Sequence, residues 1–189
     1  MTRYAGLRAV VLGQATGIGL AIAKRLVEGG AHVLLTVRSA GERADARTEL
    51  GSAARVVVHG DAGGRTGQGP EHGPGPDGGV DLVFADAVSA VRPLLPRLND
   101  GGAVVLTSAA PAPAALWELA SELASRGIRV NAVAPDCIEV PAAGASLPPL
   151  GRPGSSEEVA RAALFLATEA TFTTGARLPV DGGLHRPEP

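Results

Sequence analysis

The sequence has few of the residues that most often carry out chemistry: one cysteine, one tyrosine and a single lysine, Lys24, in 189 residues. The lone cysteine, Cys137, excludes an internal disulfide and a cysteine-rich metal site, and this usage is typical of a reducing compartment. The histidines His32, His59 and His72 each stand alone without metal-ligand spacing. We therefore predict no metal site.

Long apolar runs are also missing. No stretch approaches the ~18 apolar residues needed to cross a bilayer, and residues 1–8 lack the apolar core of a signal peptide. We therefore expect a cytoplasmic protein that does not enter a membrane. The net charge is -2, and sixteen arginines are interspersed with acidic residues, so no basic stripe is available for nucleic acid.

The length and the hydrophobic content of 45% allow one substantial core. They predict a single domain over residues 1–189, with a short tail at residues 185–189. Short apolar runs rich in valine and leucine recur along the chain and are typical of strands buried on both faces. These runs are residues 9–12, 32–37, 55–59, 80–84, 103–107, 128–133 and 177–180.

Helical patterns lie between several of these runs. Residues 18–26, 116–123 and 159–166 each keep one apolar face at helical spacing, and the last is preceded by a capping box formed by Ser155 and Glu158. The alternation of strands and helices predicts an α/β fold with one doubly wound parallel sheet.

The fold is expected to be abbreviated at two places. Residues 63–79 contain eight glycines and three prolines, so we predict a loop there in place of a crossover helix. Residues 86–99 leave room for only about three helical turns between two strands. Both changes are expected to leave apolar sheet surface uncovered, which predicts self-association or a partner.

A glycine-rich turn follows the first predicted strand and opens the first helix. Gly13, Gly17 and Gly19, with Thr16 and Ile18 among them, are spaced so that backbone amides can approach a pyrophosphate without side-chain interference. This context predicts a dinucleotide-binding turn. The alternative is a tight turn needed only for packing.

Three segments together resemble the short-chain dehydrogenase/reductase family: the glycine turn, residues 126–135 (RGIRVNAVAP) and residues 174–183 (TGARLPVDGG). The resemblance implies a Rossmann-like domain that binds NADP(H). Arg38 is placed to pair with a 2'-phosphate and Asp61 to contact the adenine, although either residue can equally be a solvent-facing strand end or a turn. Further cofactor contacts are implied at Ala62, Pro135 and Ile138.

The same family carries out its chemistry with a tyrosine and a lysine four residues apart, and this pair is absent. Tyr4 precedes the first strand and Lys24 lies along the first helix, so neither is expected to reach the site. Ser108 takes the place of the family's catalytic serine and is interpreted as a remnant. The family's Asn-Asn-Ala-Gly is replaced by Ala85-Asp86-Ala87-Val88, which brings a negative charge towards the cofactor.

Three hypotheses for function follow. The first is a catalytically deficient subunit, a pseudoenzyme that pairs with an active ketoreductase through its C-terminal helix and strand as a homo- or hetero-oligomer. The second is an atypical NADP(H)-dependent oxidoreductase or an enzyme with non-redox chemistry that uses Ser108, Asp86 or Asp136. The third is a nucleotide-binding regulatory module or a gene product without a present role.

Overall fold

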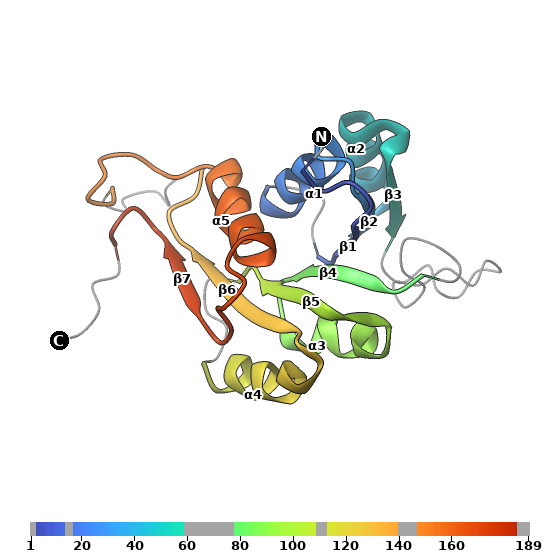
Figure 1. Cartoon of the computed structure of the whole chain (residues 1–189). Helices are drawn as coiled ribbons and strands as arrows, with labels where there is room; N and C mark the ends of the chain where they lie inside the picture. Colours follow the sequence, from blue (N-terminus) through green and yellow to red (C-terminus); the bar gives the residue numbers. More distant parts are fainter. Residues whose placement is uncertain (1–2, 14–16, 59–77, 109–112, 140–146, 185–189) are drawn as a thin grey trace.

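The computed structural model describes residues 3–13, 17–58, 78–108, 113–139 and 147–184. These residues form one seven-stranded parallel sheet in the order β3-β2-β1-β4-β5-β6-β7 (Figure 1). The strands are β1 (Arg8–Val11), β2 (His32–Val37), β3 (Ala54–Val58), β4 (Val80–Ala85), β5 (Leu98–Leu106), β6 (Arg129–Pro135) and β7 (Arg177–Val180). All of the predicted strands are confirmed, and β5 begins earlier than its apolar run suggested.

The strands are buried on both faces, as their sequences predicted. In β1, Ala9 and Val11 belong to one hydrophobic core, whereas Val10, together with Leu12 just after the strand, belongs to a second core on the other side of the sheet. Successive side chains of a strand point to opposite faces, so a strand covered on both sides needs apolar residues at every position.

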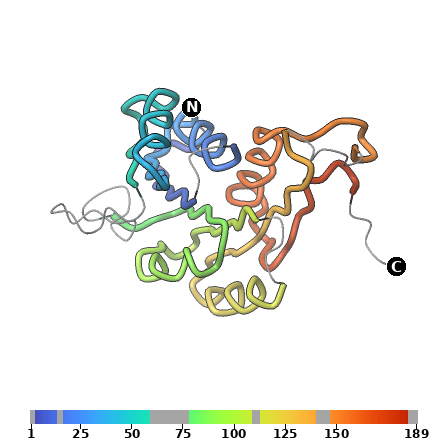
Figure 2. The backbone as a smooth tube through the Cα atoms, turned by 180° about the vertical axis from the view of Figure 1, so that it is seen from behind, coloured from blue at the N-terminus to red at the C-terminus, as the bar shows by residue number. Residues whose placement is uncertain are grey.

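Helices cover both faces of the sheet. On one face lie α1 (Ile18–Glu28), α2 (Ala40–Leu50) and α5 (Ser156–Thr168), and on the other lie α3 (Val88–Val91), the 3-10 helix η4 (Arg92–Arg97) and α4 (Pro113–Leu123). Two 3-10 turns, η1 (Gly51–Ala53) and η5 (Ala124–Arg126), precede β3 and β6. The same two layers are visible from behind (Figure 2). None of the helices in the described segments is long and apolar enough to cross a bilayer.

The connection between β4 and β5 is short, as predicted. One α-helical turn passes into the 3-10 helix η4, whose second residue is Pro93 and which also contains Pro96. Proline lacks an N–H and disfavours a regular α-helix here. The predicted loop lies mostly outside the described residues, of which only Gly78 and Gly79 precede β4 without regular structure.

The expectation of uncovered sheet surface is wrong for the described residues. Val91 of α3 and Leu94 of η4 are fully buried, so the short connection still packs on the sheet. The large hydrophobic side chains that the described residues expose are Trp117, Leu147, Leu150, Phe165 and Phe172, and all of them lie outside the strands.

Helix α5 is held at both ends. The predicted capping box is confirmed: Ser155 Oγ accepts from the Glu158 amide at 3.2 Å, and the Glu158 carboxylate accepts from the Ser155 amide at 2.9 Å. At the other end, Arg129 of β6 donates to the carbonyl oxygens of Leu166 and Ala167, each at 2.6 Å. These contacts satisfy backbone groups that a helix end leaves unpaired.

The order of the strands creates a crevice at the centre of the sheet. The chain proceeds from β1 to β2 and β3 on one side and then crosses to β4 on the other side of β1. At such a switch point the loops after neighbouring strands diverge, and ligands bind at the carboxyl ends of the strands.

Candidate functional site

The glycine turn after β1 is held by a residue of the neighbouring strand. The amide of Gly13 donates to Thr36 Oγ1 at 3.1 Å, and the Thr36 hydroxyl donates to the carbonyl of Val11 at 3.5 Å. Thr36 is 1% exposed, so this pairing satisfies a buried hydroxyl. The sequence did not predict this role of Thr36, because threonine is a β-branched residue that is common in strands such as β2.

The start of α1 brings a second glycine close to α5. Gly17 is the N-cap residue at φ 55°, and no side chain of the described residues caps this helix. A Cβ atom at Gly17 would lie 3.2 Å from Ser156 Oγ of α5. Glycine therefore permits both the left-handed backbone and the close approach of the two helix starts.

The segment after β6 delivers a carboxylate to the same place. Ser156 Oγ donates to Glu139 Oε1 at 2.5 Å, and the Glu139 amide donates to the carbonyl of Gly154 at 2.8 Å. Cys137 and Glu139 both have positive φ, 51° and 65°. Such backbone costs free energy in residues other than glycine and concentrates at functional sites.

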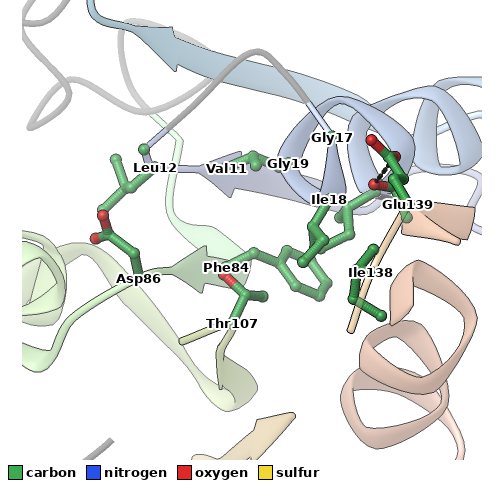
Figure 3. Close-up of a pocket in the computed structure, with 13 residues that line it drawn as sticks. Val11, Leu12, Gly17, Ile18, Gly19, Phe84, Asp86, Thr107, Ile138 and Glu139 are labelled. Carbon is green, nitrogen blue, oxygen red and sulfur yellow. Dashed lines mark hydrogen bonds between the residues drawn. The ribbon is translucent and has the colours of Figure 1, made fainter. Parts of the chain in front are cut away.

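A cavity of about 350 Å³ lies at the carboxyl ends of β1, β4 and β5. Its described lining residues are Val11, Leu12, Gly13, Gly17, Ile18, Gly19, Ile22, Phe84, Asp86, Thr107, Ile138, Glu139 and Ser156. Figure 3 shows Asp86 and Glu139 at opposite ends, with Phe84 between them. Gly13, Gly17, Ile18, Gly19 and Ile138, which the sequence assigned to cofactor binding, thus lie around one cavity.

Other predicted residues are placed elsewhere. Arg38 follows β2, where its amide donates to Glu42 Oε2 at 2.9 Å and its guanidinium lies 3.1 Å from Glu42 Oε1. Pro135 ends β6 and pairs with Val180 of β7. Neither Arg38 nor Pro135 is among the described residues that line the cavity. Thr16, Asp61 and Ala62 lie outside the described residues.

Ser108 lies two residues beyond the end of β5 and is not among the described residues that line the cavity. Thr107, the residue before it, lines the cavity and donates its hydroxyl to the carbonyl of Ala85 at 3.3 Å. Asp136 lines a separate cavity of about 490 Å³ beside β7. Asp86 and Asp136 therefore face different cavities.

The only tyrosine and the only lysine lie away from this cavity. Tyr4 precedes β1 and is 7% exposed, and its amide donates to the carbonyl of Gly29 beyond the last turn of α1. Lys24 Nζ lies 3.6 Å from Glu49 Oε2 of α2. Neither residue lines the cavity, which agrees with the reach argued from the sequence.

The charges around the cavity do not suit a diphosphate. The Asp86 carboxylate lies 3.7 Å from where a Cβ atom of Gly13 would be. Glu139 accepts a hydrogen bond from Ser156, and Ser156 in turn lies against Gly17. The described lining residues include no lysine or arginine. Two like charges about 4 Å apart repel by about 1 to 4 kcal/mol between bulk water and a protein surface. Gly13, Gly17 and Gly19 carry no side chain that would obstruct a nicotinamide dinucleotide, but the acidic side chains of Asp86 and Glu139 do not suit its diphosphate.

No group of three or more histidine, cysteine, aspartate or glutamate residues in the described segments could hold a metal ion. The polar side-chain groups of the described lining are the carboxylates of Asp86 and Glu139 and the hydroxyls of Thr107 and Ser156.

Comparisons with known proteins agree with this architecture. Residues 8–65 match the family described as short chain dehydrogenase, and residues 110–185 match the family described as enoyl-(acyl carrier protein) reductase. Oxidoreductase asL5 of Sarocladium schorii is 30% identical over 246 residues, covering 96% of this chain and 97% of that protein. The chain belongs to the short-chain dehydrogenase/reductase family. It is an oxidoreductase-family protein by sequence and by fold.

Other known proteins match over shorter stretches. The 3-oxoacyl-[acyl-carrier-protein] reductase FabG of Thermotoga maritima is 49% identical over 76 residues, and glucose 1-dehydrogenase of Gluconobacter oxydans is 49% identical over 79 residues. The chain spans only 31% and 30% of their lengths. A solved structure described as a candidate betaketoacyl-ACP reductase is 27% identical with a TM-score of 0.74, covering 95% of this chain and 98% of that chain.

Proposed function

We propose that this chain is a catalytically deficient subunit of the family that associates with an active, NADP-dependent reductase. The observation that carries the proposal is the location of Tyr4 and Lys24. Tyr4 packs at the end of the sheet opposite the cavity, and Lys24 pairs with Glu49 on the surface. Proton donation by a positioned side chain contributes ~10²- to 10⁴-fold to a rate, so its loss leaves little turnover.

The alignment with asL5 supports the interpretation that the tyrosine and lysine pair was lost through deletions inside the chain. It runs over 246 positions, more than the 189 residues of this chain, so it contains gaps within this chain. The two family matches also leave residues 66–109 unmatched between them. Both observations favour a chain shortened near its centre, where the family carries its active site.

The contact with a partner is proposed for the outer side of α5. Val159, Ala163 and Leu166 are buried in the chain's own core, so the C-terminal helix can offer only its opposite side. That side carries Arg161 and Phe165, which is 47% exposed. A large apolar ring held in water on a helix surface favours association.

Strand β7 is expected to contribute side chains rather than a new strand pairing. The carbonyls of Ala176 and Val180 accept hydrogen bonds from β6 and the residue after it, so even-numbered positions of β7 face β6. Pro179, an odd-numbered position, turns its backbone to the free edge. Proline has no N–H to donate at that edge. The edge is therefore a poor template for an added strand.

The experiment is co-expression with an intact short-chain reductase encoded beside this chain, followed by native mass spectrometry and NADPH-oxidation assays with ketoacyl substrates. We expect no turnover by the isolated chain and a stable mixed oligomer in the co-expressed sample. Phe165→Glu should abolish the mixed oligomer. The matched control is Trp117→Glu on α4, an exposed aromatic on the other face of the sheet, which should leave the oligomer intact.

Three results would contradict the proposal. Turnover by the purified chain alone would show that the catalytic pair is not needed. Loss of the oligomer with Trp117→Glu but not with Phe165→Glu would show that the contact involves α4 and not α5. The absence of a mixed oligomer with every such reductase would contradict the proposed partnership.

A ligand-binding module is the second candidate function, and the cavity itself favours it. The cavity of about 350 Å³ is large enough for a small ligand although the catalytic pair is absent. Calorimetric titration with small ligands tests this function independently of a partner.

A further inference from the structure

Asp86 occupies a special place in the cavity. It follows β4 directly, at the switch point of the sheet, and its carboxylate lies against Gly13. The side chain is exposed and makes no hydrogen bond or ion pair with any of the described residues. Asp86 therefore places an acidic side chain directly beside the backbone of Gly13.

No basic side chain among the described lining residues offsets this acidic group. Glu139, at the far end of the cavity, is also acidic and is already hydrogen-bonded by Ser156 (Figure 3). Arg38, the cation that the sequence offered to the ligand, is held by Glu42. Among its described residues, the lining of the cavity thus combines Gly13, Gly17 and Gly19 with two acidic side chains and no basic one.

We propose that Asp86 determines the ligand specificity of this cavity by excluding ligands that place a phosphate beside Gly13. The ligand that fits is a neutral one that offers hydrogen-bond donors to Asp86, of the class of an unphosphorylated nucleoside. A ribose hydroxyl can donate to the Asp86 carboxylate, whereas a phosphate oxygen at neutral pH can only repel it. This inference concerns binding and stands whether or not the chain has a catalytic partner.

The experiment compares adenosine with ADP, which differ only by the diphosphate, in calorimetric titrations of the full chain. The wild-type chain should bind ADP no more tightly than adenosine. Asp86→Asn keeps the shape but removes the charge, so it should tighten ADP binding at least about fivefold and reverse the order of the two ligands.

Two control variants separate charge from shape and from net charge. Asp86→Glu retains the charge and should still exclude ADP. Glu118→Gln removes an exposed carboxylate on α4, outside the lining of the cavity, and should change ADP affinity by less than about twofold. Thermal unfolding of each variant checks that the fold is retained.

The salt dependence of the affinity for ADP distinguishes repulsion by Asp86 from a purely structural role of this residue. Repulsion between Asp86 and the diphosphate is screened by salt, so ADP affinity of the wild-type chain should rise between low salt and about 0.5 M salt. Tighter binding of ADP than of adenosine by the wild-type chain would overturn the proposal. So would an Asp86→Asn variant that binds ADP no better than the wild-type chain, including one that binds neither ligand.

Discussion

Tyr4 has the surroundings of a packing residue. Its ring lies over Gly29 so closely that a Cβ atom there would be 2.2 Å from Tyr4 Cδ2. Its hydroxyl makes no hydrogen bond with the described residues, and its backbone joins the segment before β1 to the end of α1. The ring contributes by burial and not by proton transfer.

Tyr4→Phe should therefore leave the free energy of unfolding unchanged, because only the hydroxyl is removed. Tyr4→Ala should lower it by about 3 kcal/mol, since a buried aromatic ring is lost. Urea denaturation followed by circular dichroism measures both. Equal losses in the two variants would reveal a role for the hydroxyl and would reopen Tyr4 as a functional group.

At the scale of the element, the start of α5 depends on one carboxylate. Arg152 donates hydrogen bonds to Glu158, and the Ser155 amide adds another, which together lower the pKa of Glu158 to about 2. A carboxylate whose pKa is lower in the folded chain stabilises the fold above its unfolded pKa. That stabilisation is lost as the pH falls through the folded pKa.

Glu158→Gln should accordingly lower the melting temperature at pH 7, where the wild-type carboxylate is ionised in both states. The gap between the two proteins should close as the pH falls from about 4.5 towards about 2. Ser155→Ala, which removes the cap itself, should cost about 0.5 to 2 kcal/mol. Thermal unfolding across this range of pH is the measurement, and a gap that stays constant with pH would contradict the role of Glu158.

For the whole molecule, exposed rings point to association. Phe165 of α5 is 47% exposed, and Phe172, which follows the same helix, is fully exposed. Water-exposed rings outside a buried core favour contact with another surface.

The isolated chain should therefore self-associate when no partner is present, with Phe165→Glu shifting it towards the monomer. Its melting temperature should rise with protein concentration, because an oligomer binds only the folded state. Sedimentation velocity over a wide concentration range tests this. Glu118→Gln serves as the control, and a monomer at every concentration would contradict the expectation.

The sequence by itself determined the parallel sheet, the glycine turn and the start of α5. These features depend on patterns within a few residues: doubly apolar runs, glycine spacing, and the Ser155 and Glu158 capping pair. The sequence also determined that the tyrosine and lysine pair is missing. Helix α2 was not predicted, because it buries only Ala46 and Leu50 and has no apolar face.

Only the tertiary structure decided which side chains meet at the cavity. Thr36 supports Gly13 from another strand, Ser156 holds Glu139 from another helix, and Asp86 reaches the glycine turn across the switch point. The two residues of each pair are 23, 17 and 73 positions apart along the chain, respectively, so no local pattern links them. Packing of separate elements creates the contacts, and the charge of the cavity follows from them.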